Sequence, residues 1–144
     1  MLDVKEPLRV VMVDDDPDDL FITKSLLKRS PVPIDFKGFK SGESLFEFIK
    51  HNGIGSIDVF LIDINMPVSN GYDVLKKLRA YQSIDDITLA MFSTSKSPHE
   101  QLMASELGAD DFFTKPAKID DANPLFEMFH ECYSKAQPVL EAAE

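Results

Sequence analysis

The sequence contains one cysteine, Cys132, so it cannot form an internal disulfide. It has no apolar run approaching the ~18 residues that span a bilayer, and nothing in it resembles a signal peptide. Basic residues are outnumbered, because 15 Lys and Arg stand against 25 Asp and Glu, which gives a formal net charge of -10. Such a surface repels nucleic-acid backbones and anionic lipids. We therefore expect a cytoplasmic protein with neither nucleic acid nor membrane as a direct partner.

Length and composition predict a single domain. The chain has 144 residues, of which 44% are hydrophobic, enough to fill one core. We expect the domain to cover residues 8–135, with residues 1–7 and 136–144 as terminal extensions. We expect no output domain such as a helix-turn-helix, because the segment after the domain is too short for one.

Short runs rich in Val, Ile and Phe alternate with longer segments whose apolar residues recur every three or four positions. This alternation is typical of βα units around a parallel sheet, so it predicts an α/β fold of five strands and five helices. Helix ends are signalled by Asp16 with Pro17, by Gly108, and by Asn123 with Pro124. The expected strands are residues 9–13, 34–39, 57–62, 87–92 and 111–114.

Polar side chains follow four of the five expected strands. Ligands of such sheets gather at the carboxyl ends of the strands, where the loops leave and helix amino termini point into one crevice. We therefore expect one site built from several strand ends. Its candidate residues are Asp14, Asp15, Asp16, Asp63, Asn65, Ser93, Thr94, Ser95, Lys115 and Pro116.

The acidic residues of this group predict a metal site. Carboxylates held close together repel one another, and a hard divalent cation relieves the repulsion. Mg²⁺ prefers oxygen ligands and is commonly held by one or two carboxylates. The sequence therefore predicts a Mg²⁺ site, in which Mn²⁺ can substitute. Its ligands would be Asp14, Asp15 and Asp63, with the main-chain carbonyl of Asn65.

Two other interpretations apply to parts of the acidic cluster. Asp16, Asp18 and Asp19 fall in the first turn of a helix, where acidic groups favour the helix dipole, and this explanation is preferred for them. Asp14, Asp16 and Asp18 also have the alternate spacing of an EF-hand loop. That loop needs glycine where Asp19 stands and glutamate where Ser25 stands, so the calcium interpretation fails.

Five strings in the sequence, at their observed order and separations, resemble the receiver domain of bacterial two-component response regulators: VVMVDDD, VFLIDINMP, SNGYDVLKKLR, MFSTS and GADDFFTKP. The resemblance covers about residues 8–135. The segments DDDPDDL and FSTS are most similar to small single-domain receivers paired with bacterial phytochrome kinases. The resemblance implies a flavodoxin-like, doubly wound sheet with strand order 2-1-3-4-5.

Carried over by position, the resemblance assigns roles to the acidic residues. It implies that Asp63 accepts a phosphoryl group from a phosphohistidine. Asp15 and Asp63 would bind Mg²⁺ directly together with the Asn65 carbonyl, and Asp14 would bind it mainly through water. Asn65 and Ser95 fall where the family varies its rate of dephosphorylation.

The resemblance also assigns the remaining strand-end residues. Ser93, at the start of the loop that Thr94 continues, would donate to one phosphoryl oxygen, and Lys115 would pair with another. The bond before Pro116 is usually cis in such domains. Phe112 falls at the position of a switch aromatic, although an ordinary core aromatic is an equal alternative there.

These roles describe a signalling module that catalyses only its own phosphorylation and dephosphorylation. The implied partner is a sensor histidine kinase or a histidine phosphotransfer protein. Phosphorylation would alter a surface formed by the fourth helix, fifth strand and fifth helix, which could also support a homodimer, or the phosphoryl group would pass along a relay.

Apolar residues of the expected fifth helix cover an arc of roughly 160°, wider than the ~100° stripe that packing on a sheet requires. We interpret the excess as a dimer or partner surface, with coverage by the tail around Val139 and Leu140 as an equal alternative. The arc consists of Leu125, Phe126, Met128, Phe129, Cys132 and Tyr133.

Two rival functions use similar residues. A Mg²⁺-dependent phosphohydrolase with an aspartyl-phosphate intermediate needs the same groups, but enzymes of the haloacid-dehalogenase-like group place the nucleophile after the first strand in an Asp-x-Asp-x-Thr/Val pattern. The chain instead reads Asp14-Asp15-Asp16-Pro17-Asp18, with an aspartate where the pattern requires Thr or Val. A flavodoxin-like nucleotide binder would need a glycine-rich phosphate loop after that strand, which is missing.

Overall fold

The computed structural model describes residues 6–66, 70–81, 84–95, 97–116 and 118–136. Strands and helices alternate along this part of the chain. The strands are β1 (Leu8–Val13), β2 (Ile34–Phe39), β3 (Val59–Asp63), β4 (Thr88–Ser93) and β5 (Asp111–Thr114). The helices are α1 (Pro17–Leu27), α2 (Gly42–Asn52), α3 (Gly71–Arg79), α4 (Pro98–Glu106) and α5 (Asn123–Ala136), with short 3₁₀ turns at Ile54–Ser56, Ile84–Asp86 and Ile119–Ala122.

The five strands form one parallel sheet in the order β2-β1-β3-β4-β5. The predicted α/β class, the parallel sheet and the strand order are therefore confirmed. The register pairs Val13 with Ile62, so the next residues along the two strands, Asp14 and Asp63, stand at the same level. Both leave the sheet at its carboxyl edge, where the site was expected.

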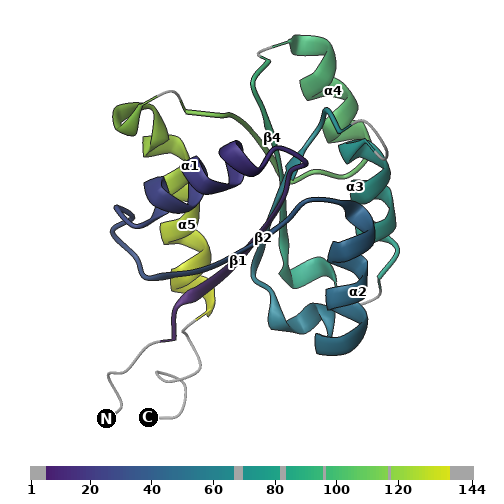
Figure 1. Cartoon of the computed structure of the whole chain (residues 1–144), viewed down its shortest axis with the longest axis horizontal. Helices are drawn as coiled ribbons and strands as arrows, with labels where there is room; N and C mark the ends of the chain where they lie inside the picture. Colours follow the sequence, from purple (N-terminus) through teal and green to yellow (C-terminus); the bar gives the residue numbers. More distant parts are fainter. Residues whose placement is uncertain (1–5, 67–69, 82–83, 96, 117, 137–144) are drawn as a thin grey trace.

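Helices cover both faces of the sheet, with α1 and α5 on one face and α2, α3 and α4 on the other (Figure 1). Each face has its own hydrophobic core. The three central strands are almost completely buried, whereas the edge strands β2 and β5 are partly exposed. Within the described residues, no helix is both long and apolar enough to cross a membrane.

The predicted helix signals are confirmed at all three positions. Asp16 caps α1, because its side chain accepts a hydrogen bond from the Asp18 amide and Pro17 begins the helix. Gly108 follows α4 with a φ of 99°, in the left-handed region that favours glycine. Asn123 and Pro124 are the first two residues of α5, which directly follows a 3₁₀ turn.

The wide apolar arc of α5 is not the exposed surface that the sequence suggested. Leu125, Phe126, Met128 and Phe129 are all buried, and only Cys132 and Tyr133 are half-buried. The arc packs in one cluster with side chains of β1, β3, β4 and α1. A helix that packs against both a sheet and a neighbouring helix buries a wider arc than a sheet alone requires. The arc therefore gives no support to a homodimer, which stays a prediction, and the tail lies outside the described residues.

An arginine ties the end of α3 to the turn before β5. The Arg79 guanidinium donates to the carbonyl of Gly108 at 2.7 Å and to the Asp110 carboxylate at 3.1 Å. The same Asp110 oxygen accepts a hydrogen bond from the Leu89 amide at 2.8 Å. These contacts fix β5 beside β4 and so fix the strand that delivers Lys115 to the carboxyl edge.

Gly71, the first residue of α3, packs directly on the backbone of Asp63. A Cβ added at residue 71 would collide with the carbonyl oxygen of Asp63. We therefore expect Gly71→Ala to lower the free energy of unfolding by about 2 kcal/mol, because the helix must move away from the strand. Thermal or urea unfolding measures this, with Gly55→Ala as control, since a Cβ there meets no heavy atom within 4 Å. Equal stability of the two variants would contradict the close packing.

Candidate functional site

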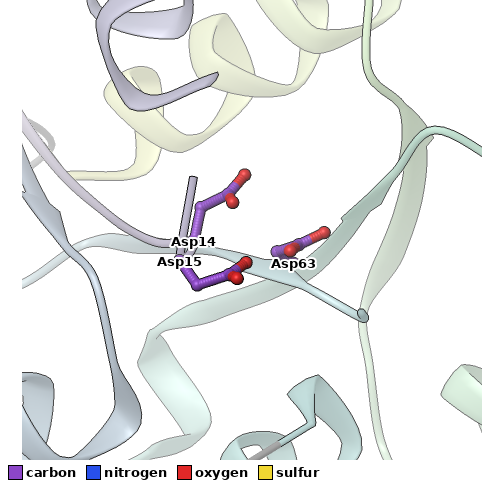
Figure 2. A group of neighbouring side chains, drawn as sticks. All are labelled: Asp14, Asp15 and Asp63. Carbon is purple, nitrogen blue, oxygen red and sulfur yellow. The ribbon is translucent and has the colours of Figure 1, made fainter. Parts of the chain in front are cut away.

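Three carboxylates from two neighbouring strands converge at the carboxyl edge of the sheet (Figure 2). Asp14 and Asp15 follow β1 directly, and Asp63 is the last residue of β3. One oxygen of each carboxylate lies within 4.8 Å of the other two. Asp14 and Asp63 are 0% and 5% exposed, whereas Asp15 is more accessible. The predicted cluster is therefore brought together, with two buried members and one at its mouth.

Lys115, which follows β5, reaches into the same cluster. Its Nζ lies 2.6 Å from Oδ2 of Asp14 and 3.2 Å from Oδ1 of Asp63. The other oxygen of Asp14 accepts a hydrogen bond from the amide of Asp16 at 3.0 Å. Lys115 is thus the cation that compensates two buried carboxylates, and the sequence correctly placed it beside them.

The structure adds Asp19, which the sequence analysis assigned only to the helix dipole. Its Oδ2 accepts a hydrogen bond from Lys115 Nζ at 2.9 Å. Burial of the ammonium group favours its neutral form, but the hydrogen bonds to Asp14 and Asp19 outweigh burial, so the pKa of Lys115 is raised. Asp19 therefore does more than favour the helix dipole, because it also holds the lysine of the site.

Asp63 is the carboxylate whose environment most disfavours its charge. Burial raises the pKa of Asp63 to about 6, and the charges of Asp14 and Asp15 act in the same direction, while Lys115 opposes them. One lysine does not neutralise this many acidic groups. The site therefore has a deficit of positive charge around Asp63.

The raised pKa of Asp63 predicts a pH dependence of stability in metal-free protein. Because the folded pKa lies above the ordinary value, this group contributes stability that is complete at low pH and is lost as pH rises through about 6. Between pH 4 and pH 7, the free energy of unfolding of the wild type should fall relative to Asp63→Asn by on the order of 2 kcal/mol. Urea unfolding of both proteins with chelator at several pH values measures the difference. If the difference in the free energy of unfolding between the two proteins did not change with pH, the pKa of Asp63 would not be raised by folding.

The donor set fits a hard divalent cation. All side-chain donors are carboxylate oxygens, two are buried, and the accessible Asp15 leaves room for water or a phosphate oxygen to complete the shell. Such a cation would supply the charge that Lys115 alone does not. Asn65 is exposed and precedes the buried Met66, and its main-chain carbonyl remains the predicted additional ligand.

Ser93 ends β4 with its hydroxyl engaged inside the following loop. The Oγ accepts a hydrogen bond from the Ser95 amide at 3.0 Å and donates to Glu100 Oε1 at 3.3 Å. The carbonyl of Ser93 accepts from the amide of Lys115 at 2.7 Å, so the ends of β4 and β5 lie side by side. Thr94 is exposed and Ser95 is partly buried. The hydroxyl loop therefore borders the lysine, as the sequence predicted.

Comparison with known families decides the identity of this arrangement. The family model described as "Response regulator receiver domain" matches residues 10–125, most of the chain. The chain belongs to this family. The matched residues include every carboxylate, hydroxyl and lysine of the site.

A curated relative supports the assignment of this receiver domain. It is 30% identical over 122 residues to the two-component response regulator ORR1 of Oryza sativa subsp. japonica, covering 81% of this chain and 53% of the relative. The chain thus spans about half the length of that curated relative. The resemblance to a receiver domain that was stated from the sequence alone is confirmed.

Solved structures confirm the fold. The Mn²⁺-bound form of the response regulator Rcp1 superposes with a TM-score of 0.66 at 22% identity, covering 89% of this chain and 93% of that one. The phosphorylated cyanobacterial phytochrome response regulator RcpA gives 0.67 at 20% identity, covering 96% and 98%. At these identities the likeness establishes the shared fold of the receiver domain.

Two expectations carried over from the family have different outcomes in this receiver domain. No cis peptide bond occurs among the described residues, so the bond before Pro116 is trans, and the expectation of a cis bond is wrong for this structure. The difference in free energy between the two isomers of such a bond is only about 0.5–1 kcal/mol, and Lys115 reaches the carboxylates with the trans form. Phe112 is half-buried against the core shared with α2 and α3, which leaves its switch role a prediction.

Proposed function

We propose that Asp63 accepts a phosphoryl group from a phosphohistidine on a sensor histidine kinase or a histidine phosphotransfer protein. The observation that carries this proposal is the placement of Lys115 Nζ against both Asp14 and Asp63, beside a third carboxylate, at the converging ends of three strands. In the transfer, a carboxylate oxygen of Asp63 forms a bond to phosphorus as the bond between phosphorus and the imidazole nitrogen breaks. The imidazole is the leaving group, and the product is an acyl phosphate.

The site supplies what this transfer needs. Phosphoryl transfer passes through a loose transition state with charge on the equatorial oxygens, so fixed cationic and hydroxyl donors provide most of the stabilisation. Lys115 is held by three carboxylates within 3.2 Å, close to where a phosphoryl group on Asp63 would lie. A bound Mg²⁺ would supply further positive charge beside Asp14, Asp15 and Asp63. Lys115 and Ser93 would each donate to a phosphoryl oxygen.

The signal would depend on Ser93. Phosphorylation shifts a conformational equilibrium only if the phosphoryl group binds one state better than another. In the structure, the Ser93 hydroxyl is engaged within its own loop. Reorienting this hydroxyl toward the phosphoryl group would move the loop and α4, altering a protein-contact surface or leaving the phosphoryl group available for a relay. The module would catalyse only its own phosphorylation and dephosphorylation.

The phosphodonor protein would dock over α1. This helix borders the site, because its Asp19 contacts Lys115. Two successive residues on it, Phe21 and Ile22, are 70% and 55% exposed, which is unusual for large apolar side chains. A protein that brings a phosphohistidine to Asp63 must cover the mouth of the site. The exposed apolar side chains of α1 would give it a contact surface on a helix that borders the site.

The stoichiometry of phosphoryl uptake tests the proposal. Incubated with Mg²⁺ and acetyl phosphate, the protein is expected to gain one acid-stable, base-labile phosphoryl group per chain, measured by intact-mass spectrometry. Omission of Mg²⁺ or addition of EDTA should suppress the uptake, because the repulsion at the site is then uncompensated. Continuous release of many phosphates per chain, without a stoichiometric plateau, would instead favour the phosphohydrolase interpretation.

A further inference from the structure

Glu100, in the first turn of α4, contacts the hydroxyl that the proposed function needs. Its Oε1 accepts the hydrogen bond from Ser93 Oγ at 3.3 Å. Ser93 is fully buried, and the side chain of Glu100 is partly buried beside it. A hydroxyl has a single proton to donate, so Ser93 cannot serve Glu100 and a phosphoryl oxygen at once.

The usual task of a glutamate at this helical position is performed by another residue. Ser97 caps α4 by accepting a hydrogen bond from the Glu100 amide at 3.4 Å. In a capping box the glutamate side chain would return to the amide of the cap residue. Here the Ser97 amide instead donates to Ser95 Oγ at 3.0 Å. The carboxylate of Glu100 is therefore directed to Ser93 and is not required for capping.

A second hydroxyl lies close enough to sense the charge of Glu100. Tyr72 stands in the first turn of α3, next to Gly71, which packs on the backbone of Asp63. Its hydroxyl is buried and has no hydrogen-bond partner among the described residues. Burial raises the pKa of the Tyr72 phenol, and the negative charge of Glu100 raises it further. A buried donor without a partner is costly and calls for an explanation.

We propose that Glu100 is a positioning residue that exchanges hydrogen-bond donors, taking Ser93 in the unmodified protein and Tyr72 when Ser93 turns to a phosphoryl group on Asp63. The inference rests on the proposed function. The phosphoryl oxygens carry more negative charge than Glu100, so they are the stronger acceptors for the Ser93 hydroxyl. Glu100 then loses its donor beside a new negative charge, and the unused phenol of Tyr72 offers a replacement. The exchange shifts the first turn of α4 toward α3.

The first experiment needs no phosphoryl group. The chain has three tyrosines and no tryptophan, so its ultraviolet emission comes from tyrosine. A phenol that donates to a carboxylate loses emission. Ser93→Ala frees Glu100 in unmodified protein, so its emission should be lower than that of the wild type. In a Tyr72→Phe background, Ser93→Ala should leave the tyrosine emission unchanged. In a Tyr133→Phe background, which is altered on the opposite face of the sheet, Ser93→Ala should still lower the emission.

Emission that is unchanged in Ser93→Ala, or a loss that persists in the Tyr72→Phe background, would overturn the inference. This arm stands whether or not Asp63 is phosphorylated. Failure of the proposed function is detected separately, as absent phosphoryl uptake by mass spectrometry.

The second experiment follows the modified protein. With Mg²⁺ and acetyl phosphate, tyrosine emission of the wild type should fall in step with phosphoryl uptake, and Tyr72→Phe should take up phosphate without that change. Glu100→Gln keeps the size of the side chain and removes its charge. It should bind the phosphoryl mimic fluoroberyllate, with Mg²⁺, roughly three- to tenfold more tightly, because Ser93 is held by a weaker acceptor. Unchanged affinity in Glu100→Gln would contradict competition for the hydroxyl.

Discussion

The Asp63→Asn protein is expected to take up no phosphoryl group from acetyl phosphate and Mg²⁺, with labelling reduced about a hundredfold or more. An amide oxygen carries no charge and is a poor nucleophile, and neither Asp14 nor Asp15 replaces Asp63. Asp14 is fully buried and held at one oxygen by Lys115 and at the other by the Asp16 amide. Asp15 lies at the mouth of the site and does not contact the lysine in any described interaction.

The measurement is intact-mass spectrometry, followed by borohydride reduction of the acyl phosphate to locate it. Asp18→Asn is the matched control, because it removes an exposed carboxylate from the same neighbourhood without touching the cluster. It should label as the wild type does. Retained labelling of Asp63→Asn at the wild-type level would refute the acceptor assignment. Loss of folding is not a concern for this variant, since removing the strained charge should stabilise the metal-free protein.

Replacement of Lys115 should have the largest effect on stability. Lys115→Met keeps the apolar stem but leaves the carboxylates of Asp14 and Asp63, with side chains 1% and 7% exposed, without their cation. Loss of one partner from a buried charge pair is strongly destabilising, so we expect the free energy of unfolding to fall by about 3 kcal/mol at neutral pH without metal. Urea unfolding measures it.

Controls separate charge from packing in this variant. Lys118→Met changes an exposed lysine on the same loop and should leave stability nearly unchanged. Adding Asp14→Asn to Lys115→Met should recover part of the loss, since one uncompensated charge is removed, and Mg²⁺ should also recover part of it. Equal stability of Lys115→Met and Lys118→Met would contradict a compensating role. In function, Lys115→Met should still take up some phosphate with a blunted conformational response.

The sequence predicted most of the fold because its apolar runs are short and clearly bounded. The expected bounds of the second and fifth strands agree with β2 and β5. The third strand was expected from residue 57 but begins at Val59, because Ile57 is buried in the turn that precedes the strand. An apolar residue buried by a turn has the same sequence signature as one buried by a strand, so the pattern alone could not separate them.

The exposure of α5 could not be predicted for a related reason. The width of an apolar arc reports how much of a helix is covered but not by which element. Phe129 is 0% exposed because α1 and the sheet enclose the helix together, an arrangement that depends on tertiary packing.

The main members of the site followed from strand-end positions, but two further carboxylates were missed. Asp19 lies in the first turn of α1, so its position in the sequence fits the helix dipole as well as a contact with Lys115. Glu100 has the sequence pattern of a capping box with Ser97, so the sequence predicts a capping interaction for its side chain and not the contact with Ser93. That contact depends on the side-chain hydrogen bonds of the loop, which the sequence pattern does not specify.

The helix that carries Glu100 is also weakly anchored. Along its nine residues, α4 has a single buried side chain, that of Ala104, whereas α3 of the same length buries Val74, Leu75 and Leu78. A shift of α4 would therefore leave almost no cavity in the core and would expose little apolar surface to water. A conformational change that begins at Asp63 would thus displace α4 more easily than α3 on the same face of the sheet, while the buried central strands stay in place.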